Sequence, residues 1–154
     1  MPVQRVREYV KQFDLNLEPI EFTEKTSTVE EAAKVLGVEP GQIAKSILFR
    51  AKEHFGLFVT AGDVKVNLKR VKALLEGKPK MATPEEVEEV TGFRVGGVCP
   101  FAMRREVPIY LDESMQRFDV VYTAAGSASS ALPITFSQLC EVTGGSVVNV
   151  LTEE

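Results

Sequence analysis

Lys45 stands in the segment Gln42-Ile43-Ala44-Lys45-Ser46, which we predict to be a loop between a short helical turn and an apolar strand. From that junction a lysine can point off the sheet edge into a cleft, where its compact positive charge could hold a phosphate. The alternative is a solvent-exposed lysine that flanks a strand and discourages pairing with another chain. Because most lysines are exposed, the residue type alone favours the alternative.

Two further segments carry residues that could shape a binding site. In residues 91–101, the adjacent glycines Gly96 and Gly97 precede Pro100. The glycines allow unusual backbone conformations, and the proline restricts the backbone where the loop ends. Such a loop can present backbone amides and carbonyls to a ligand, as an oxyanion hole does. Residues 124–131 are all small and follow an expected strand, so they could line a pocket. The alternatives are a plain turn for the first segment and a surface loop for the second.

Residues that often perform covalent or metal chemistry are scarce. The chain has two cysteines, Cys99 and Cys140, and one histidine, His54, and it lacks a Cys-x-x-Cys motif. We therefore expect no dedicated metal site and no cofactor. As a nucleophile Cys99 would need a neighbouring base, and we place His54 in a hairpin turn. We interpret Cys99 as a packing or pocket-lining residue and Cys140 as part of the core.

The basic residues are distributed unevenly. The formal net charge of −4 argues weakly against a nucleic-acid-binding protein. Between positions 65 and 80, however, Glu76 is the one acidic residue among six basic ones. The basic residues of this stretch are Lys65, Lys69, Arg70, Lys72, Lys78 and Lys80. They indicate either a surface that binds a phosphate backbone or the solvated face of a helix. On the charge pattern alone, the solvated helix face is favoured.

Apolar residues at helical spacing predict five helices. We place them over residues 3–13, 28–36, 67–75, 84–91 and 135–142. A capping box, either Ser27 with Glu30 or Thr28 with Glu31, begins the second helix. In the third helix we expect four leucine and valine side chains to face inward: Leu68, Val71, Leu74 and Leu75.

Runs rich in β-branched and aromatic residues predict the strands. They cover residues 19–23, 46–50, 56–61, 107–111, 118–123 and 146–150, with a hairpin between the second and third. This pattern predicts one compact domain over residues 1–154, of the α/β class with α+β character, in which helices surround a mixed, mostly antiparallel sheet. We expect a cytoplasmic protein with no membrane partner, because the chain shows neither a signal peptide nor an apolar run of about 20 residues.

Four groups of residues, in order along the chain, resemble the YbaK/prolyl-tRNA-editing domain family. They are Ala44-Lys45-Ser46-Ile47-Leu48-Phe49, Asn67-Leu68-Lys69-Arg70, Thr91-Gly92-Phe93 through Gly96-Gly97-Val98-Cys99-Pro100-Phe101, and Leu111-Asp112-Glu113 through Ala125-Gly126. The resemblance extends from about Val29 to Val142. It implies a free-standing editing domain that hydrolyses the ester between a wrong amino acid, such as alanine or cysteine, and tRNA.

The resemblance also implies roles for individual residues. Lys45 corresponds to the family lysine that holds the 3′-terminal adenosine and its phosphate. The family Gly-x-x-x-Pro loop falls on Gly96 to Pro100, whose backbone positions water or the ester. Lys45 is the expected catalytic-site residue, and the residues expected to bind the substrate beside it are Ser46, Gly96, Gly97, Val98, Pro100 and Gly126. The acceptor stem of the tRNA would then contact Lys65, Lys69, Arg70 and Lys72.

The chain departs from the family pattern in one loop. Residues 126–131 carry no charged side chain, whereas the family often has basic residues followed by an acidic one there, and some alanine-editing members have a histidine. The main expectation is a trans-acting aminoacyl-tRNA deacylase for Cys- or Ala-tRNAPro, with aminoacyl-tRNA and prolyl-tRNA synthetase as candidate partners. The alternatives are a non-catalytic module of the same fold that binds tRNA or a synthetase, and a small-molecule binding protein. The sequence leaves a monomer and a homodimer open.

Overall fold

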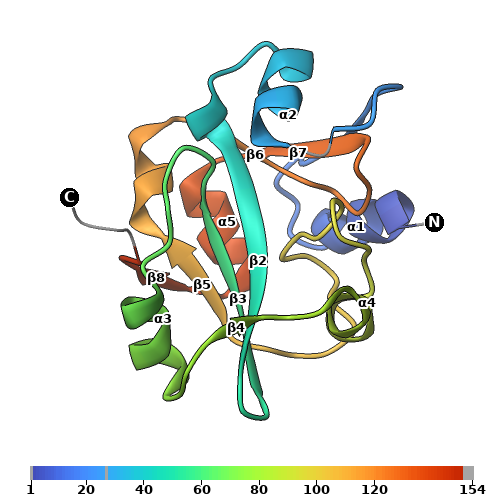
Figure 1. Cartoon of the computed structure of the whole chain (residues 1–154). Helices are drawn as coiled ribbons and strands as arrows, with labels where there is room; N and C mark the ends of the chain where they lie inside the picture. The colour runs from blue at the N-terminus through green and yellow to red at the C-terminus, as the bar shows by residue number, and fades with distance from the viewer. Residues whose placement is uncertain (1, 27, 151–154) are drawn as a thin grey trace.

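The computed structural model describes residues 2–26 and 28–150. Its helices are α1 (Pro2–Lys11), α2 (Val29–Leu36), α3 (Leu68–Leu75), α4 (Pro84–Thr91) and α5 (Phe136–Thr143), with 3-10 turns η1 (Pro40–Gln42) and η2 (Glu113–Arg117). Its strands are β1 (Ile20–Glu21), β2 (Ile43–Ala51), β3 (His54–Ala61), β4 (Lys80–Met81), β5 (Ile109–Asp112), β6 (Val121–Thr123), β7 (Ser130–Ile134) and β8 (Ser146–Val148). Figure 1 shows β2 and β3 as a long hairpin through the middle of the molecule. None of the helices in these ranges is long and apolar enough to cross a membrane.

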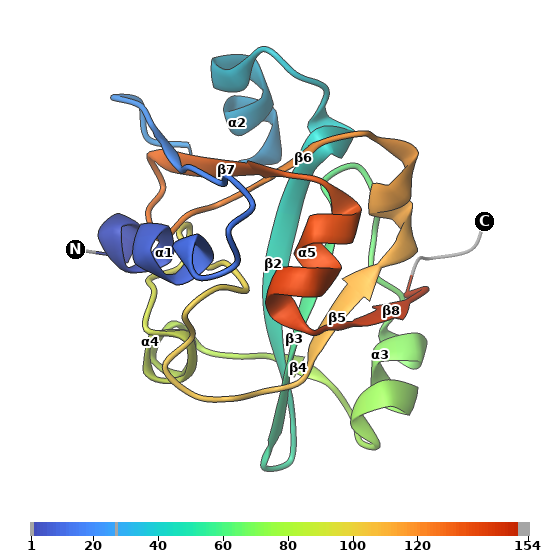
Figure 2. The same ribbon diagram turned by 180° about the vertical axis from the view of Figure 1, so that it is seen from behind.

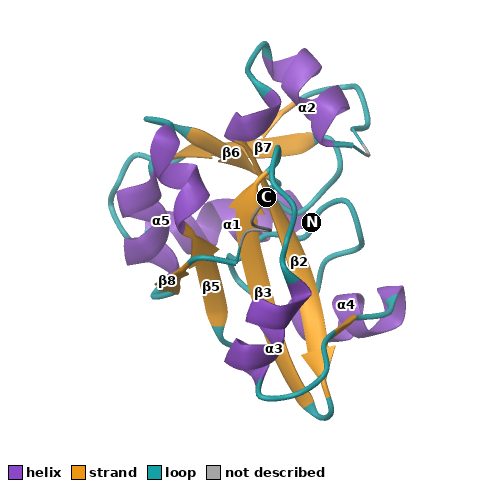
Figure 3. Cartoon of the chain, turned by 60° about the vertical axis from the view of Figure 1, so that its left-hand side comes forward, coloured by secondary structure: helices purple, strands orange, loops and turns teal. Residues whose placement is uncertain are grey.

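The strands form one mixed sheet in the order β1-β7-β6-β2-β3-β5-β8, with β4 paired to β2 outside this path. The ladders β1–β7, β2–β3, β2–β4 and β6–β7 are antiparallel, and β2–β6, β3–β5 and β5–β8 are parallel. Helices lie around this sheet (Figure 3). The predicted class, a mixed and mainly antiparallel sheet surrounded by helices, is therefore confirmed.

One edge of β2 lies along β3, and its other edge has two partners separated by a gap. β6 pairs only with Ile43 and Ala44, and β4 pairs only with Phe49 and Arg50. The Ala82 amide lengthens the β4 side by donating to the Leu48 carbonyl at 2.9 Å. Between these two partners, no strand of the described residues lies beside residues 45–47 on this edge.

The two faces of the sheet carry separate cores, because side chains along β2 and β3 alternate between them. Ala44 and Leu48 belong to the larger core, together with buried residues of α1, α4 and α5. Figure 2 shows α5 lying over the strands on this side. Phe49 and Phe58 belong to the smaller core, where the buried residues of α3 cover them. Lys45 alternates with Ala44, so its side chain leaves β2 toward the face of the smaller core.

Local capping explains where most helices begin. Thr28, Thr83 and Thr135 each accept a hydrogen bond from the amide three residues later. At Thr83 and Thr135 the glutamate or glutamine of the first turn bonds back to the cap, which completes a capping box. The predicted starts of α4 and α5 are confirmed. For α2 the structure shows Thr28 as the cap, and the alternative with Ser27 lies outside the described residues.

Several expected boundaries were wrong. The segment from Ile43 to Ser46 is part of β2 and not a loop, because Ile43 and Ala44 already pair with β6. β4 was not expected, and β7 takes over the end of the expected small-residue loop from Ser130 onward. Leu68 does not face inward, since it is the first residue of α3 and 54% exposed. His54 is not in the hairpin turn but is the exposed first residue of β3.

Candidate functional site

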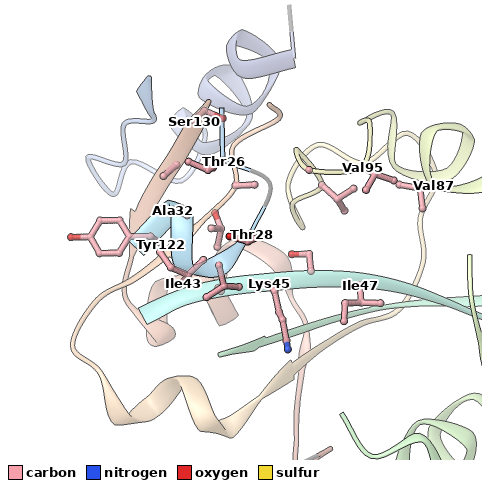
Figure 4. A pocket seen from close by; sticks show the side chains of 18 of the residues that line it. Thr26, Thr28, Ala32, Ile43, Lys45, Ile47, Val87, Val95, Tyr122 and Ser130 are labelled. Atoms are coloured by element: carbon pink, nitrogen blue, oxygen red, sulfur yellow. The ribbon is translucent and has the colours of Figure 1, made fainter. Parts of the chain in front are cut away.

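A cavity of about 300 Å³ lies along the gap in the edge of β2. Residues from four parts of the chain line it: 22–36, 43–48, 81–98 and 122–131. Figure 4 shows Thr28 and Val95 on one side of β2 and the Lys45 amine on the other side. The cavity thus lies along the bare strand edge, and its lining residues include Lys45 and Ile47, which alternate with Ala44, Ser46 and Leu48 along β2.

The lining is apolar apart from hydroxyl groups and one charge. Lys45 is the one ionisable residue in it besides Tyr122, and no His, Cys, Asp or Glu of the described residues lines the cavity. The hydroxyl-bearing residues of the lining are Thr26, Thr28, Ser46, Tyr122, Thr123 and Ser130, of which Ser46 and Thr123 have buried hydroxyl oxygens. Such a lining can exclude water, fix a ligand by shape and strengthen each polar contact, because the surroundings have a low dielectric.

The two expected glycine-containing segments meet beside this cavity. The Gly126 amide donates to the Gly97 carbonyl at 3.1 Å. A Cβ on Gly97 would lie 2.6 Å from the Gly126 carbonyl oxygen, so a side chain there would force the two segments apart. Gly96 and Val98 line the cavity, while Gly97 and Gly126 are buried behind it. Pro100 does not line this cavity but lies beside a separate hollow with Tyr9 and Met103.

The Lys45 ammonium lies on the smaller-core side of β2, opposite Thr28 and Val95 (Figure 4). It donates to the Val64 carbonyl at 2.6 Å. Burial lowers the pKa of Lys45 below its usual value, and the nearby carboxylates of Asp63 and Glu30 partly oppose that shift. Because an ammonium has three donors, the contact with Val64 leaves two for an incoming anion.

The basic residues expected to contact tRNA gather on and beside α3, away from the cavity lining. α3 packs on the smaller core, so this group shares a face with the Lys45 amine. Lys65, Lys69 and Lys72 are exposed. Arg70 is half-buried and donates to the Asn149 carbonyl at 3.1 Å. The structure therefore separates these basic residues from Gly96 and Val98 but places them on the same side as Lys45.

Cys99 has the environment of a packing residue and not that of a nucleophile. It is fully buried in the larger core. Burial raises the pKa of its thiol to about 12, which leaves almost no thiolate at neutral pH. Its Sγ lies 3.9 Å from the Phe101 carbonyl, and Cys99 does not line the cavity.

The N-terminal helix supports both glycine-containing segments. Arg5 donates through Nη2 to the Thr91 carbonyl at 2.9 Å, and its guanidinium lies 4.3 Å from the centre of the Phe93 ring. It thereby places a cation at the C-terminus of α4, where the helix dipole favours positive charge and where α4 has no basic residue of its own. At Gly126, a Cβ would lie 2.8 Å from the Pro2 carbonyl oxygen. Local sequence patterns gave no sign of this support, because the contacts join residues far apart in the chain.

Comparison with known proteins identifies the family. The model of the aminoacyl-tRNA editing domain matches residues 23–142, so the chain belongs to that family, and the resemblance seen in the sequence is confirmed. The uncharacterized protein YwhH of Bacillus subtilis is 39% identical over 142 residues, which cover 92% of this chain and 90% of YwhH. EbsC of Enterococcus faecalis, provisionally named a Cys-tRNA(Pro)/Cys-tRNA(Cys) deacylase, is 26% identical over 86% of this chain and 82% of its own. A crystal structure described provisionally as a trans-editing enzyme for prolyl tRNA synthetase superposes with a TM-score of 0.92 at 34% identity, covering 99% of this chain and 98% of that one.

Replacing Arg5 should loosen the segment that carries Gly96. In Arg5→Ala we expect the protected amides of Gly92, Phe93 and Gly97 to exchange about tenfold faster, because a hydrogen bond from a charged group is worth roughly 1.5–3 kcal/mol. Hydrogen exchange followed by mass spectrometry measures this. Arg7→Ala is the matched control, since Arg7 lies on the same helix but pairs with Glu18 and Glu21. Equal exchange in the two variants would contradict the assigned role of Arg5.

Two buried threonines should respond oppositely to replacement by valine. The Thr123 hydroxyl is buried without a hydrogen-bond partner among the described residues, so Thr123→Val should raise the free energy of unfolding by about 1 kcal/mol. Thr91 is equally buried, but its hydroxyl donates to the Val87 carbonyl at 2.7 Å, so Thr91→Val should lower it by a similar amount. Urea unfolding of both variants measures the difference, and destabilisation by Thr123→Val would show that its hydroxyl is paired.

Proposed function

We propose that this member of the aminoacyl-tRNA editing domain family is a trans-acting deacylase that hydrolyses the ester of mischarged tRNA, with Cys- or Ala-tRNAPro as its substrates. The observation that carries the proposal is the cavity on the edge of β2, whose lining residues are apolar or hydroxyl-bearing and include Lys45. The relatives point the same way, since one is provisionally named a Cys-tRNA deacylase and another is provisionally described as a trans-editing enzyme.

The reaction suits a site without an acid, a histidine or a thiolate. Water adds to the ester carbonyl, the bond to the ribose oxygen breaks, and that oxygen takes a proton, which yields the free amino acid and the tRNA 3′ end. An aminoacyl ester is already activated, so positioning and stabilisation of the oxyanion can supply much of the rate. The apolar walls contribute by making the fixed dipoles at the reacting carbonyl more effective.

In this proposal Lys45 anchors the phosphate next to the terminal adenosine. Its ammonium lies on the smaller-core side of β2 and keeps two donors beyond the contact with Val64. The rest of the 3′ end would cross the strand edge toward Gly96 and Val98. Met81 and Val95 line the cavity and are 69% and 66% exposed, so they offer apolar surface to the terminal base.

The basic residues on and beside α3 extend the proposed contact to the acceptor stem. Lys65 directly follows Val64, whose carbonyl binds the Lys45 ammonium. Lys69 and Lys72 are exposed on α3, which covers the same face of the sheet. A tRNA strand that follows these charges would reach Lys45 before its 3′ end enters the cavity.

The second candidate function is a non-catalytic module that binds tRNA or prolyl-tRNA synthetase. The observation in its favour is that residues 126–131 carry no charge and that no Asp, Glu or His of the described residues lines the cavity. Such a module would bind uncharged and mischarged tRNA with similar affinity and would turn over neither.

Replacing Lys45 should separate the two functions. We expect Lys45→Ala to lower kcat/KM on Cys- or Ala-tRNAPro about 10- to 100-fold, because a charge-assisted hydrogen bond contributes roughly 1.5–3 kcal/mol. The measurement is release of labelled amino acid from a panel of mischarged tRNAs. Lys34→Ala, an exposed lysine of α2 that does not line the cavity, should match the wild type. If the wild-type protein binds tRNA tightly and hydrolyses no member of the panel, the binding module is the correct function.

A further inference from the structure

The gap in the edge of β2 exposes backbone groups to the cavity. Residues 45–48 all line the cavity, and on this edge the ladders stop at Ala44 on one side and resume at Leu48 on the other. The groups that would have paired with a strand here are therefore available to a ligand.

Strand alternation identifies which backbone groups these are. The Leu48 carbonyl accepts from the Ala82 amide, so the peptide groups of Leu48 point away from β3. In a strand, the amide and carbonyl of one residue point to the same edge, and those of the next residue point to the opposite edge. The amide and carbonyl of Ser46 consequently point into the gap, whereas those of Lys45 and Ile47 point toward β3, beside Thr60 and Phe58. No hydrogen bond of the Ser46 amide or carbonyl on this edge occurs among the described residues.

An unpaired strand edge in an apolar cavity is stabilised by a ligand that hydrogen-bonds to its peptide groups. A buried peptide group without a hydrogen bond costs free energy, and proteins normally cover or charge a bare strand edge. Here α2 and the segments around Val95 and Ala124 enclose the edge instead, so a second strand has little room. The partner that fits is small and carries one donor and one acceptor at the spacing of a single amino-acid residue.

We propose that the aminoacyl group binds as a one-residue strand opposite Ser46, which rests on the proposed deacylase function. Two residues that face each other in an antiparallel ladder can exchange both hydrogen bonds. In the same way, the α-ammonium of the substrate donates to the Ser46 carbonyl, and its ester carbonyl accepts from the Ser46 amide. The Ser46 amide then also stabilises the negative charge that grows on this oxygen when water attacks.

The arrangement has a consequence for substrate choice. The Ser46 carbonyl requires a donor on the α-carbon of the acyl group, whatever the side chain is. An acyl group that lacks this donor leaves the carbonyl unpaired in an apolar site, and sites built to hydrogen-bond a substrate reject analogues that lack the matching group.

A series of three-carbon acyl groups on one tRNA tests the α-donor. Alanyl, lactyl and propionyl esters of tRNAPro carry an ammonium, a hydroxyl and no donor, respectively. After each rate is divided by that of spontaneous hydrolysis, we expect kcat/KM to fall in this order, with propionyl at least about tenfold below alanyl. Equal normalised values for alanyl and propionyl would overturn the inference while leaving the deacylase function intact.

Two variants at position 46 separate the backbone amide from the side chain. Ser46→Pro removes the amide hydrogen but keeps the carbonyl, and it spares the ladder to β3 because this amide points into the gap. Ser46→Ala removes only the hydroxyl, so it measures how much of any decrease in kcat comes from the side chain. We expect Ser46→Pro to lower kcat at least about tenfold further than Ser46→Ala does. Equal kcat values in two variants with wild-type circular dichroism would contradict the role of the amide.

A binding measurement remains informative if Ser46→Pro does not fold or the protein shows no turnover. The probe is adenosine with alanine joined to its 3′ carbon through an amide, which cannot be hydrolysed as an ester. In amide-resolved NMR of the wild-type protein, this probe should shift the Ser46 resonance and slow its hydrogen exchange, and the propionyl counterpart should do so less. Binding that shifts Gly96 and Val98 but leaves Ser46 unchanged would overturn the inference. A Ser46 response without hydrolysis of any tRNA ester would support it and refute the deacylase function.

Discussion

The interrupted ladder on the outer edge of β2 is the constraint on which the site depends. β2 is paired with β3 from Ala44 to Ala51, but on its other edge β6 ends at Ala44 and the β4 side begins at Leu48. A continuous neighbour would have filled the space that the cavity occupies. The strand itself stays rigid, because its inner edge and both of its faces are packed. Polar backbone groups are thereby held in a fixed direction toward the cavity, which is the preorganisation that the proposed deacylase function would require.

The second requirement is a wall opposite this edge, and two glycines make it possible. Gly97 and Gly126 bring two loop backbones into hydrogen-bonding contact that side chains would prevent. Gly126 also has a φ of 103°, which residues with a side chain rarely adopt. α1 holds the pair from behind through Pro2 and Arg5. A wall made of loops thus acquires the fixed geometry that loops usually lack.

Features that depend on interactions between residues near in sequence could be predicted from the sequence, and features that depend on distant residues could not. The starts of α4 and α5 follow from cap residues within one turn of the helix, so Thr83 and Thr135 revealed them. The start of β2 at Ile43 depends on pairing with Tyr122, and β7 pairs with β1 more than a hundred residues earlier, so neither had a local signal. At the site, the family resemblance drew attention to Lys45, Gly96 and Gly126. The direction of the Lys45 side chain follows from strand alternation along β2. The start of β2 is set by its pairing with the distant strand β6, so this direction had no local signal. The roles assigned to these residues stay predictions.

The contact between Arg5 and Thr91 joins residues 86 positions apart, and this bears on how the molecule folds. α1 docks onto loops that follow it at a distance along the chain, and Gly126 lies further along still. Closing such a long loop carries an entropic cost that must be met before the contact forms. The hairpin of β2 and β3 needs only local contacts and can assemble early. We therefore expect the cavity wall to become ordered after this hairpin, so that the site is complete only when these long-range contacts have formed.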